Sequence, residues 1–274
     1  THGEFWIPES ERDSYQLALR SLNEAGVPYV VSGLYAMYQY TGIYRQTKDL
    51  DLLMEARHVI DAARTLKAAG FQVRLEQAHW IAKASRDEAS IDLIYGTGNG
   101  LFLIDRAWIQ RSRAGLLAAT PVRIAPPEEL IWHRLFIWER HRSDAADIVH
   151  LILARGDELD WARLLDRVGD HWRLLLMQVH YFDYVYPGYR PRIPAWVREE
   201  LFSRALDTMD EVGPRTICRG TLVSRFSFAI DVNEWGFRDL RHEAVCAVRQ
   251  LPIIREIQSH PIWDDQADQE EEMA

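Results

Sequence analysis

The chain has 274 residues, which is enough for one large domain or two smaller ones. A hydrophobic share of 47% and a charged share of 27% are typical of globular proteins, and the sequence predicts no membrane span. The net charge of −9 argues against broad electrostatic binding of nucleic acid. Two cysteines, Cys218 and Cys246, are too few for a disulfide framework, which favours a cytoplasmic location.

Hydrophobic periodicity and turn residues predict alternating helices and strands in the first half of the chain. Polar residues 85–89 separate two apolar runs, which predicts an antiparallel hairpin, and the glycine-rich residues 95–100 are expected to form a flexible loop. Helices are expected over residues 10–26, 33–42 and 57–70, and strands over residues 28–32, 50–54, 71–76, 79–84, 90–96 and 120–124.

The second half reads as almost entirely helical, with helices expected over residues 128–141, 144–156, 160–182 and 195–209. The sequence therefore predicts an α/β (α+β) fold in which a mixed sheet with flanking helices precedes a mainly helical region. We expect a catalytic domain over residues 1–125, a helical domain over 126–265, and a disordered acidic tail over 266–274.

Three carboxylates on predicted strands form the main chemical signal. Asp49 and Asp51 flank Leu50, so that both aspartates project to one side of a strand. Two close carboxylates repel each other, but a divalent cation stabilises them, and oxygen ligands favour Mg²⁺. Asp92 lies on a later strand, and three carboxylates on neighbouring strands could hold the two metal ions of a phosphoryl-transfer site.

A phosphate-binding turn is predicted just before these acids. Ser32 and Gly33 lie where a strand turns into a helix, and free backbone N–H groups at a helix start favour phosphate. Arg45 and Lys48 precede the aspartates and are placed to neutralise phosphate charge.

Each motif taken alone has a simpler interpretation. The aspartates could be solvated surface acids, Ser32-Gly33 an ordinary turn, and Asp92 a cap of the hairpin. The order of the three motifs along the chain favours the metal site.

This ordered set resembles the nucleotidyltransferase superfamily, which has a polymerase-beta-like core. In that family an apolar strand ends in Gly followed by Gly or Ser, an acid–apolar–acid doublet follows a helix, and a third carboxylate lies on a later strand. The family's first pair maps onto Ser32 and Gly33, its doublet onto Asp49 and Asp51, and its third carboxylate onto Asp92. Ser32 replaces the family's first glycine.

A narrower resemblance concerns bacterial nucleotidyltransferases of the AbiEii toxin-like group. Arg45, Thr47 and the doublet match the group's pattern Arg-x-(Ser/Thr)-x-Asp-apolar-Asp, which places Thr47 with the nucleotide-binding residues. Residues 126–152 resemble the helical segment that follows in that group, and Asp144 and Asp147 match its downstream acids. The resemblance extends to about Arg155.

The AbiEii-like group carries a lysine, implicated in activity, at the position of His133. Lysine is a permanent cation at neutral pH, whereas histidine is largely neutral. Three alternatives follow: His133 is used differently, Arg134 or Lys83 takes over, or activity is lost.

The resemblance implies a metal-dependent nucleotidyltransferase that moves a nucleoside monophosphate from an NTP to tRNA, another nucleic acid, a protein or a small molecule. Asp49 and Asp51 would bind Mg²⁺ (or Mn²⁺), and Asp92 would complete the second metal shell and help to deprotonate the acceptor. The alternatives are a catalytically silent binding module and a toxin paired with an antitoxin protein. Residues expected around this site are Lys83, His133, Asp144 and Asp147.

Overall fold

The computed structural model describes residues 3–266, and the chain divides into two compact units. The first unit contains the residues up to Pro126 and those from His242 onward, and the second is Pro127–Arg241. The acidic tail expected over residues 266–274 lies, from residue 267, outside the described residues.

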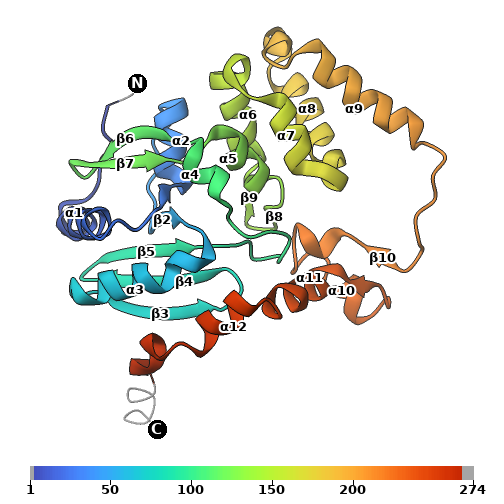
Figure 1. Ribbon diagram of the computed structural model, residues 1–274. Coiled ribbons are helices and arrows are strands. Elements are labelled where there is room, and N and C mark those ends of the chain that lie inside the picture. Colours follow the sequence, from blue (N-terminus) through green and yellow to red (C-terminus); the bar gives the residue numbers. More distant parts are fainter. Residues whose placement is uncertain (1–2, 267–274) are drawn as a thin grey trace. The chain divides into compact units, whose positions relative to one another are not determined.

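The first unit is built on a mixed sheet, as the sequence predicts (Figure 1). Its strands are β1 (Val30–Val31), β2 (Leu50–Leu53), β3 (Gln72–Gln77), β4 (Ile81–Arg86), β5 (Ala89–Ile94), β6 (Arg113–Leu117) and β7 (Thr120–Ile124). Within residues 3–266 these strands form one seven-stranded sheet in the order β3-β4-β5-β2-β1-β7-β6. The pairs β2–β5 and β1–β7 are parallel and the other pairs are antiparallel.

Two helices pack against this sheet, α1 (Glu9–Glu24) and α3 (Val59–Ala68), and Figure 1 shows α3 lying against β3 and β4. Along β5 the buried Ile91 and Leu93 alternate with the less buried Ser90 and Asp92. Because side chains of a strand alternate between its two faces, α1 and α3 cover the apolar face. The opposite face carries Asp51, Asp92 and Lys83 toward the middle of their strands, with the buried Ile81 and Ile94 two residues further along. The remaining elements of this half are α2 (Gly33–Thr41), η1 (Ala56–His58) and α4 (Arg106–Gln110).

The end of the chain returns to the first unit. Helix α12 (Pro252–Ser259) packs against η1, and η6 (Pro261–Gln266) packs against α3 and β3. Helix α11 (Leu240–Arg249) contributes the buried Val245. The expected helical domain over residues 126–265 therefore differs from the observed division in its C-terminal part, because these helices bury their apolar faces against the sheet unit.

The second unit is mainly helical, as expected from the sequence. The helix expected over residues 128–141 ends at Arg134, because the chain turns there into a small hairpin. The elements of this unit are α5 (Pro127–Arg134), β8 (Trp138–Glu139), β9 (Arg142–Ser143), α6 (Ala145–Arg155), η2 (Gly156–Glu158), α7 (Trp161–Val168), η3 (Gly169–His171), α8 (Trp172–Val185), η4 (Pro187–Arg192), α9 (Ala195–Asp207), β10 (Ile217–Cys218), η5 (Gly220–Leu222), α10 (Ala229–Asn233) and β11 (Arg238–Asp239).

Two local features of the first unit differ from the expectation. Strand β6 pairs with β7 through a turn at Ala118 and Ala119, whose φ angles of 47° and 53° are left-handed. Such turns normally contain Asn or Gly, so the sequence carries no signal for this hairpin. Residues 95–100 are not a flexible loop: Thr97 and Asn99 are buried, and Thr97 Oγ1 donates to the carbonyl of Phe102.

No helix among residues 3–266 has the length and apolar character that a membrane crossing requires.

Candidate functional site

The turn between β1 and α2 is in direct contact with Asp51. The backbone N–H of Ser32 donates to the carbonyl of Asp51 over 2.9 Å. Gly33 has a φ of 59°, and a Cβ atom at this position would overlap the Asp51 carboxylate. Only glycine combines this left-handed conformation with so close an approach. The structure therefore brings the predicted turn and the second acid of the doublet together.

Three charged residues line up across neighbouring strands on the polar face of the sheet. Asp51 of β2 is the register partner of Asp92 of β5, which is in turn the register partner of Lys83 of β4. Register partners point to the same face, so the three side chains form a row.

Lys83 and Asp92 form an ion pair. The distance from Lys83 Nζ to Asp92 Oδ1 is 2.8 Å, and the two side chains are only 23% and 13% exposed. Burial raises the pKa of the Asp92 carboxyl; Lys83 opposes this shift, while Asp49 and Glu76 add to it. For Lys83, burial lowers the pKa, but the contact with Asp92 and the charges of Asp49 and Glu76 outweigh burial, so the net pKa is raised.

The first acid of the doublet lies just outside the strand, because β2 begins at Leu50. Asp49 nevertheless acts electrostatically on both Lys83 and Asp92, which places its charge beside the row. Thr47 Oγ1 donates to the carbonyl of Asp49 over 3.1 Å and so stabilises the approach to β2. The segment before Asp49 contains the predicted phosphate-binding residues Arg45 and Lys48, and both are exposed.

The carboxylates suit a hard divalent cation by their chemistry, since Mg²⁺ and Mn²⁺ prefer oxygen ligands. Asp51 contacts the Ser32-Gly33 turn, for which the sequence predicts phosphate binding, and Asp49 lies two residues before Asp51. Among the described residues, however, no three His, Cys, Asp or Glu side chains converge as a set of metal ligands. The doublet fits a metal ion, whereas Asp92 already has a cationic partner in Lys83.

Arg74 extends this row onto β3 and pairs with Glu76, which lies two residues further along the same strand, and the sequence had pointed to neither residue. Arg74 of β3 is the register partner of Lys83, and its Nη2 lies 2.9 Å from Glu76 Oε2. The alternation of polar and apolar residues from Gln72 to Gln77 was the available signal, because it assigns Arg74 and Glu76 to one face.

The remaining predicted site residues lie in the second unit, where Asp144 and Asp147 are buried. Arg134 Nε is 3.7 Å from Asp144 Oδ2 and 3.5 Å from Asp147 Oδ2. The exposed Arg142 adds a second contact, with its Nε 3.1 Å from Asp144 Oδ1. These acids thus join α5 to the start of α6 through a buried ionic cluster.

His133 precedes this cluster on α5. The pKa of His133 is lowered to about 4, chiefly by burial and also by the positive charges of Arg134 and Arg142, which together outweigh the opposing influence of Asp144. The imidazole is therefore neutral at pH 7 and does not supply the permanent charge of the lysine found in the AbiEii-like group. Lys83 is the cation that the structure places directly beside the acids.

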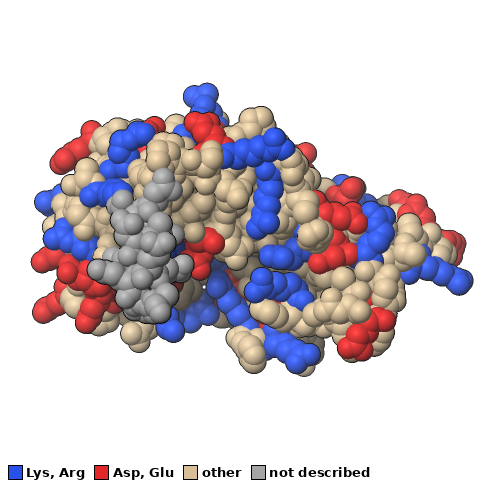
Figure 2. All heavy atoms as spheres, turned by 90° about the horizontal axis from the view of Figure 1, so that it is seen from below, with Lys and Arg blue, Asp and Glu red and all other residues tan. Residues whose placement is uncertain are grey.

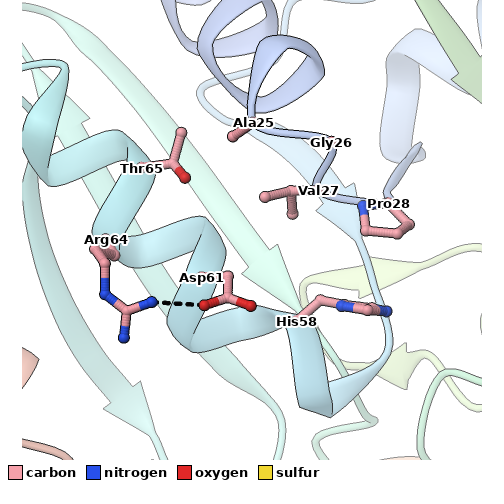
Figure 3. Close-up of a pocket in the computed structure, with 8 residues that line it drawn as sticks. All are labelled: Ala25, Gly26, Val27, Pro28, His58, Asp61, Arg64 and Thr65. Atoms are coloured by element: carbon pink, nitrogen blue, oxygen red, sulfur yellow. Dashed lines mark hydrogen bonds and ion pairs between the residues drawn. The ribbon is translucent and has the colours of Figure 1, made fainter.

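A separate open pocket of about 410 Å³ lies in the first unit (Figure 3). It is lined by Ala25, Gly26, Val27, Pro28, His58, Asp61, Arg64 and Thr65. Residues 25–28 precede β1 and the Ser32-Gly33 turn follows it, so the pocket and the turn lie at opposite ends of this strand. Figure 3 shows Asp61 and Arg64 of α3 pointing toward each other. Arg64 Nη1 lies 2.6 Å from Asp61 Oδ1. The pocket is distinct from the row of charges.

One face of the molecule carries Lys and Arg as well as Asp and Glu side chains. Figure 2 shows Lys and Arg next to Asp and Glu over the face that it draws, with no area of a single sign covering it.

Comparisons with known proteins place the chain in a family. No curated protein matches it at a significant level. Among solved structures it is similar to the antibiotic-resistance factor ANT(2″)-Ia, with 18% identity and a TM-score of 0.40 over 62% of this chain and 96% of that one. It is also similar to the lincosamide antibiotic adenylyltransferase LnuA (16% identity, TM-score 0.39, 53% and 96% covered) and to JHP933 from Helicobacter pylori (14%, 0.36, 98% and 99%).

The narrower resemblance to the AbiEii toxin-like group stays a prediction. The superfamily resemblance, in contrast, is confirmed by a family model. That model, described as "Uncharacterised nucleotidyltransferase", matches residues 12–177, which is more than half of the chain and includes the turn, the doublet and Asp92. The chain belongs to this family of nucleotidyltransferases.

Proposed function

We propose that the protein transfers a nucleoside monophosphate from an NTP to an acceptor hydroxyl in a reaction that depends on Mg²⁺ or Mn²⁺. The observation that carries this proposal is the contact of the Ser32-Gly33 turn with Asp51, in register with Asp92. A phosphate-binding turn and two carboxylates then share one edge of the polar sheet face.

The turn would hold the triphosphate, because the backbone at the start of α2 and the helix dipole favour a bound anion. Arg45 and Lys48 are exposed on the segment before β2, where they would neutralise phosphate charge, and Thr47 supports the same segment. Asp49 and Asp51 would hold the divalent cation. When bound, this cation neutralises phosphate charge and orients the α-phosphate for attack.

Asp92 would act as the proton acceptor. The acceptor oxygen forms a bond to the α-phosphorus, the bond from that phosphorus to the bridging oxygen breaks, and pyrophosphate leaves. The hydroxyl proton passes to the Asp92 carboxylate. Since burial raises the pKa of this carboxyl, it is a better proton acceptor than a solvated aspartate.

A catalytically silent binding module is the second candidate, and one observation favours it. His133 is neutral at pH 7, so the position of the group's active lysine carries no charge. NTP binding in calorimetry without pyrophosphate release on any acceptor fraction would support this candidate. An antitoxin partner, a bacterial source and a cytoplasmic location rest on the sequence alone.

The direct test is transfer of label from α-labelled NTPs with Mg²⁺ to RNA, protein and small-molecule fractions. Asp51→Asn and Asp49→Ala should lower transfer at least about a hundredfold, because both remove charge from the phosphate site. Asp61→Asn is the matched control, since Asp61 lies on α3, is 59% exposed and pairs with Arg64. Equal labelling by the wild type and Asp51→Asn would end the proposal.

A further inference from the structure

Lys83 occupies the position next to the third carboxylate. Its ammonium nitrogen lies 2.8 Å from Asp92 Oδ1, which is the distance of a charge-assisted hydrogen bond. The strand register sets this contact, because Lys83 and Asp92 are direct partners in the β4–β5 ladder. The pair is therefore part of the sheet rather than a chance meeting of two long surface side chains.

The position of Lys83 also matters for the whole set of acids. Asp92 is the register partner of Asp51, so one cation lies at the end of the row Lys83–Asp92–Asp51. If Asp92 bound a metal ion, its carboxylate would contact both that ion and the largely buried ammonium group of Lys83. Two cations that close repel each other, and the repulsion is stronger where water is excluded.

Asp92 has a cationic partner without a second metal ion. Lys83 supplies a positive charge to Asp92, and the described residues contain no convergent set of three metal-ligating side chains. Asp49 and Asp51, two residues apart in the chain, supply the carboxylate oxygens that a divalent cation can bridge.

We propose that Lys83 takes the place of the second divalent cation, so that this site works with one metal ion, held by Asp49 and Asp51. The inference rests on the proposed function and makes it more specific. Lysine has three donors, so that its ammonium group can bond Asp92 and still contact a phosphate oxygen of the bound nucleotide. Lys83 then acts as a binding and positioning residue for the nucleotide.

The test counts metal ions rather than turnover. The full chain is titrated with Mn²⁺ in the presence of a non-hydrolysable NTP, and bound Mn²⁺ is followed by electron paramagnetic resonance. We expect one Mn²⁺ per chain in the wild type. Two Mn²⁺ ions per chain would overturn the role of Lys83 and leave the nucleotidyltransferase proposal intact. No bound Mn²⁺ would instead contradict the metal dependence on which both proposals rest.

Variants identify the residue that limits the count. Lys83→Gln should allow a second Mn²⁺ to bind, because it frees Asp92 and removes the repulsion. Arg74→Gln is the matched control: Arg74 is the register neighbour of Lys83 but pairs with Glu76, so its loss should leave one Mn²⁺. A single Mn²⁺ in Lys83→Gln would contradict the inference.

A second measurement does not depend on how Lys83→Gln folds. Asp92→Asn should change the Mn²⁺ dissociation constant of the wild-type site less than about threefold, because Asp92 is not a ligand of this ion. Asp51→Asn should weaken it more than about tenfold. Equal weakening by both variants would show that Asp92 binds the metal and would overturn the proposal.

Discussion

Gly33 and Asp51 are packed so closely that a Cβ atom at residue 33 would overlap the Asp51 carboxylate. The backbone hydrogen bond from Ser32 to Asp51 holds the turn and the strand at this separation. The motif residues of the turn and of the doublet thus depend on each other for their geometry, although eighteen positions separate residues 33 and 51 in the sequence.

Gly33→Ala should abolish nucleotide binding and destabilise the fold by about 1–3 kcal/mol, because it combines a left-handed φ of 59° with the overlap on Asp51. Calorimetry with an NTP and urea unfolding measure the two effects. Gly26→Ala is the control, since Gly26 has a φ of 68° but no atom within 4 Å of a Cβ placed there. It should lose stability only and keep nucleotide binding. Equal binding by both variants would contradict the contact between Gly33 and Asp51.

His133 should make the stability of the protein depend on pH. The folded-state pKa is lowered to about 4 from 6.5, so the unfolded chain binds more protons between these values. The contribution is fully present above pH 6.5 and is lost as the pH falls toward 4. Between pH 7 and pH 4.5 the wild type should therefore lose about 2 kcal/mol more stability than His133→Gln.

Urea unfolding at both pH values measures this difference. His141→Gln is the matched control, because His141 is an exposed histidine of the same unit. It should follow the wild type at both pH values. If the wild type and His133→Gln lost the same amount of folding stability between pH 7 and pH 4.5, His133 would not be held in its neutral form by burial.

A substitution at Gly100 tests how closely α11 packs against residues 95–100 of the first unit. A Cβ atom there would lie 2.6 Å from the backbone nitrogen of Val245 in α11 and 2.8 Å from the backbone carbon of Ala244. Gly100→Ala should therefore loosen α11 and destabilise the protein by about 1–3 kcal/mol. Trypsin cleavage after the exposed Arg249 and Arg255 should become faster.

Gly98→Ala is the control for this change, since a Cβ atom at Gly98 would meet the Trp80 ring at ordinary contact distances of 3.5 Å and above. Its cleavage rate should match that of the wild type. Unchanged cleavage in Gly100→Ala would contradict the packing of residues 95–100 against α11.

Local sequence patterns were sufficient to predict many of the helices and strands of the first unit. The polar residues 85–89 between two apolar runs predicted the β4–β5 hairpin. The pattern of apolar residues predicted α1 and α3, because an amphipathic period records which side of a helix is buried. The β6–β7 hairpin escaped this reasoning. Its turn residues Ala118 and Ala119 adopt left-handed angles for which alanine gives no sequence signal.

The candidate site likewise has a part that the sequence predicted and a part that it did not. The order of Ser32-Gly33, the doublet and Asp92 was readable along the chain, since each motif is a short run of residue types that the chemistry needs. The ion pair of Asp92 with Lys83 could not be predicted from such local patterns. Lys83 meets Asp92 because of the register between β4 and β5, and a shift of one residue would have sent the lysine to the other face.

By itself the sequence determined the kind of protein: a mixed α/β nucleotidyltransferase with its acids and its Ser32-Gly33 turn in the family's order. Only the tertiary structure decided that Lys83 joins the acids, that His133 is neutral, and that the last helices return to the sheet unit. Periodicity and motifs are local properties of the chain. Ion pairs, desolvation and long-range packing depend instead on which distant residues meet, and that is a property of the folded molecule.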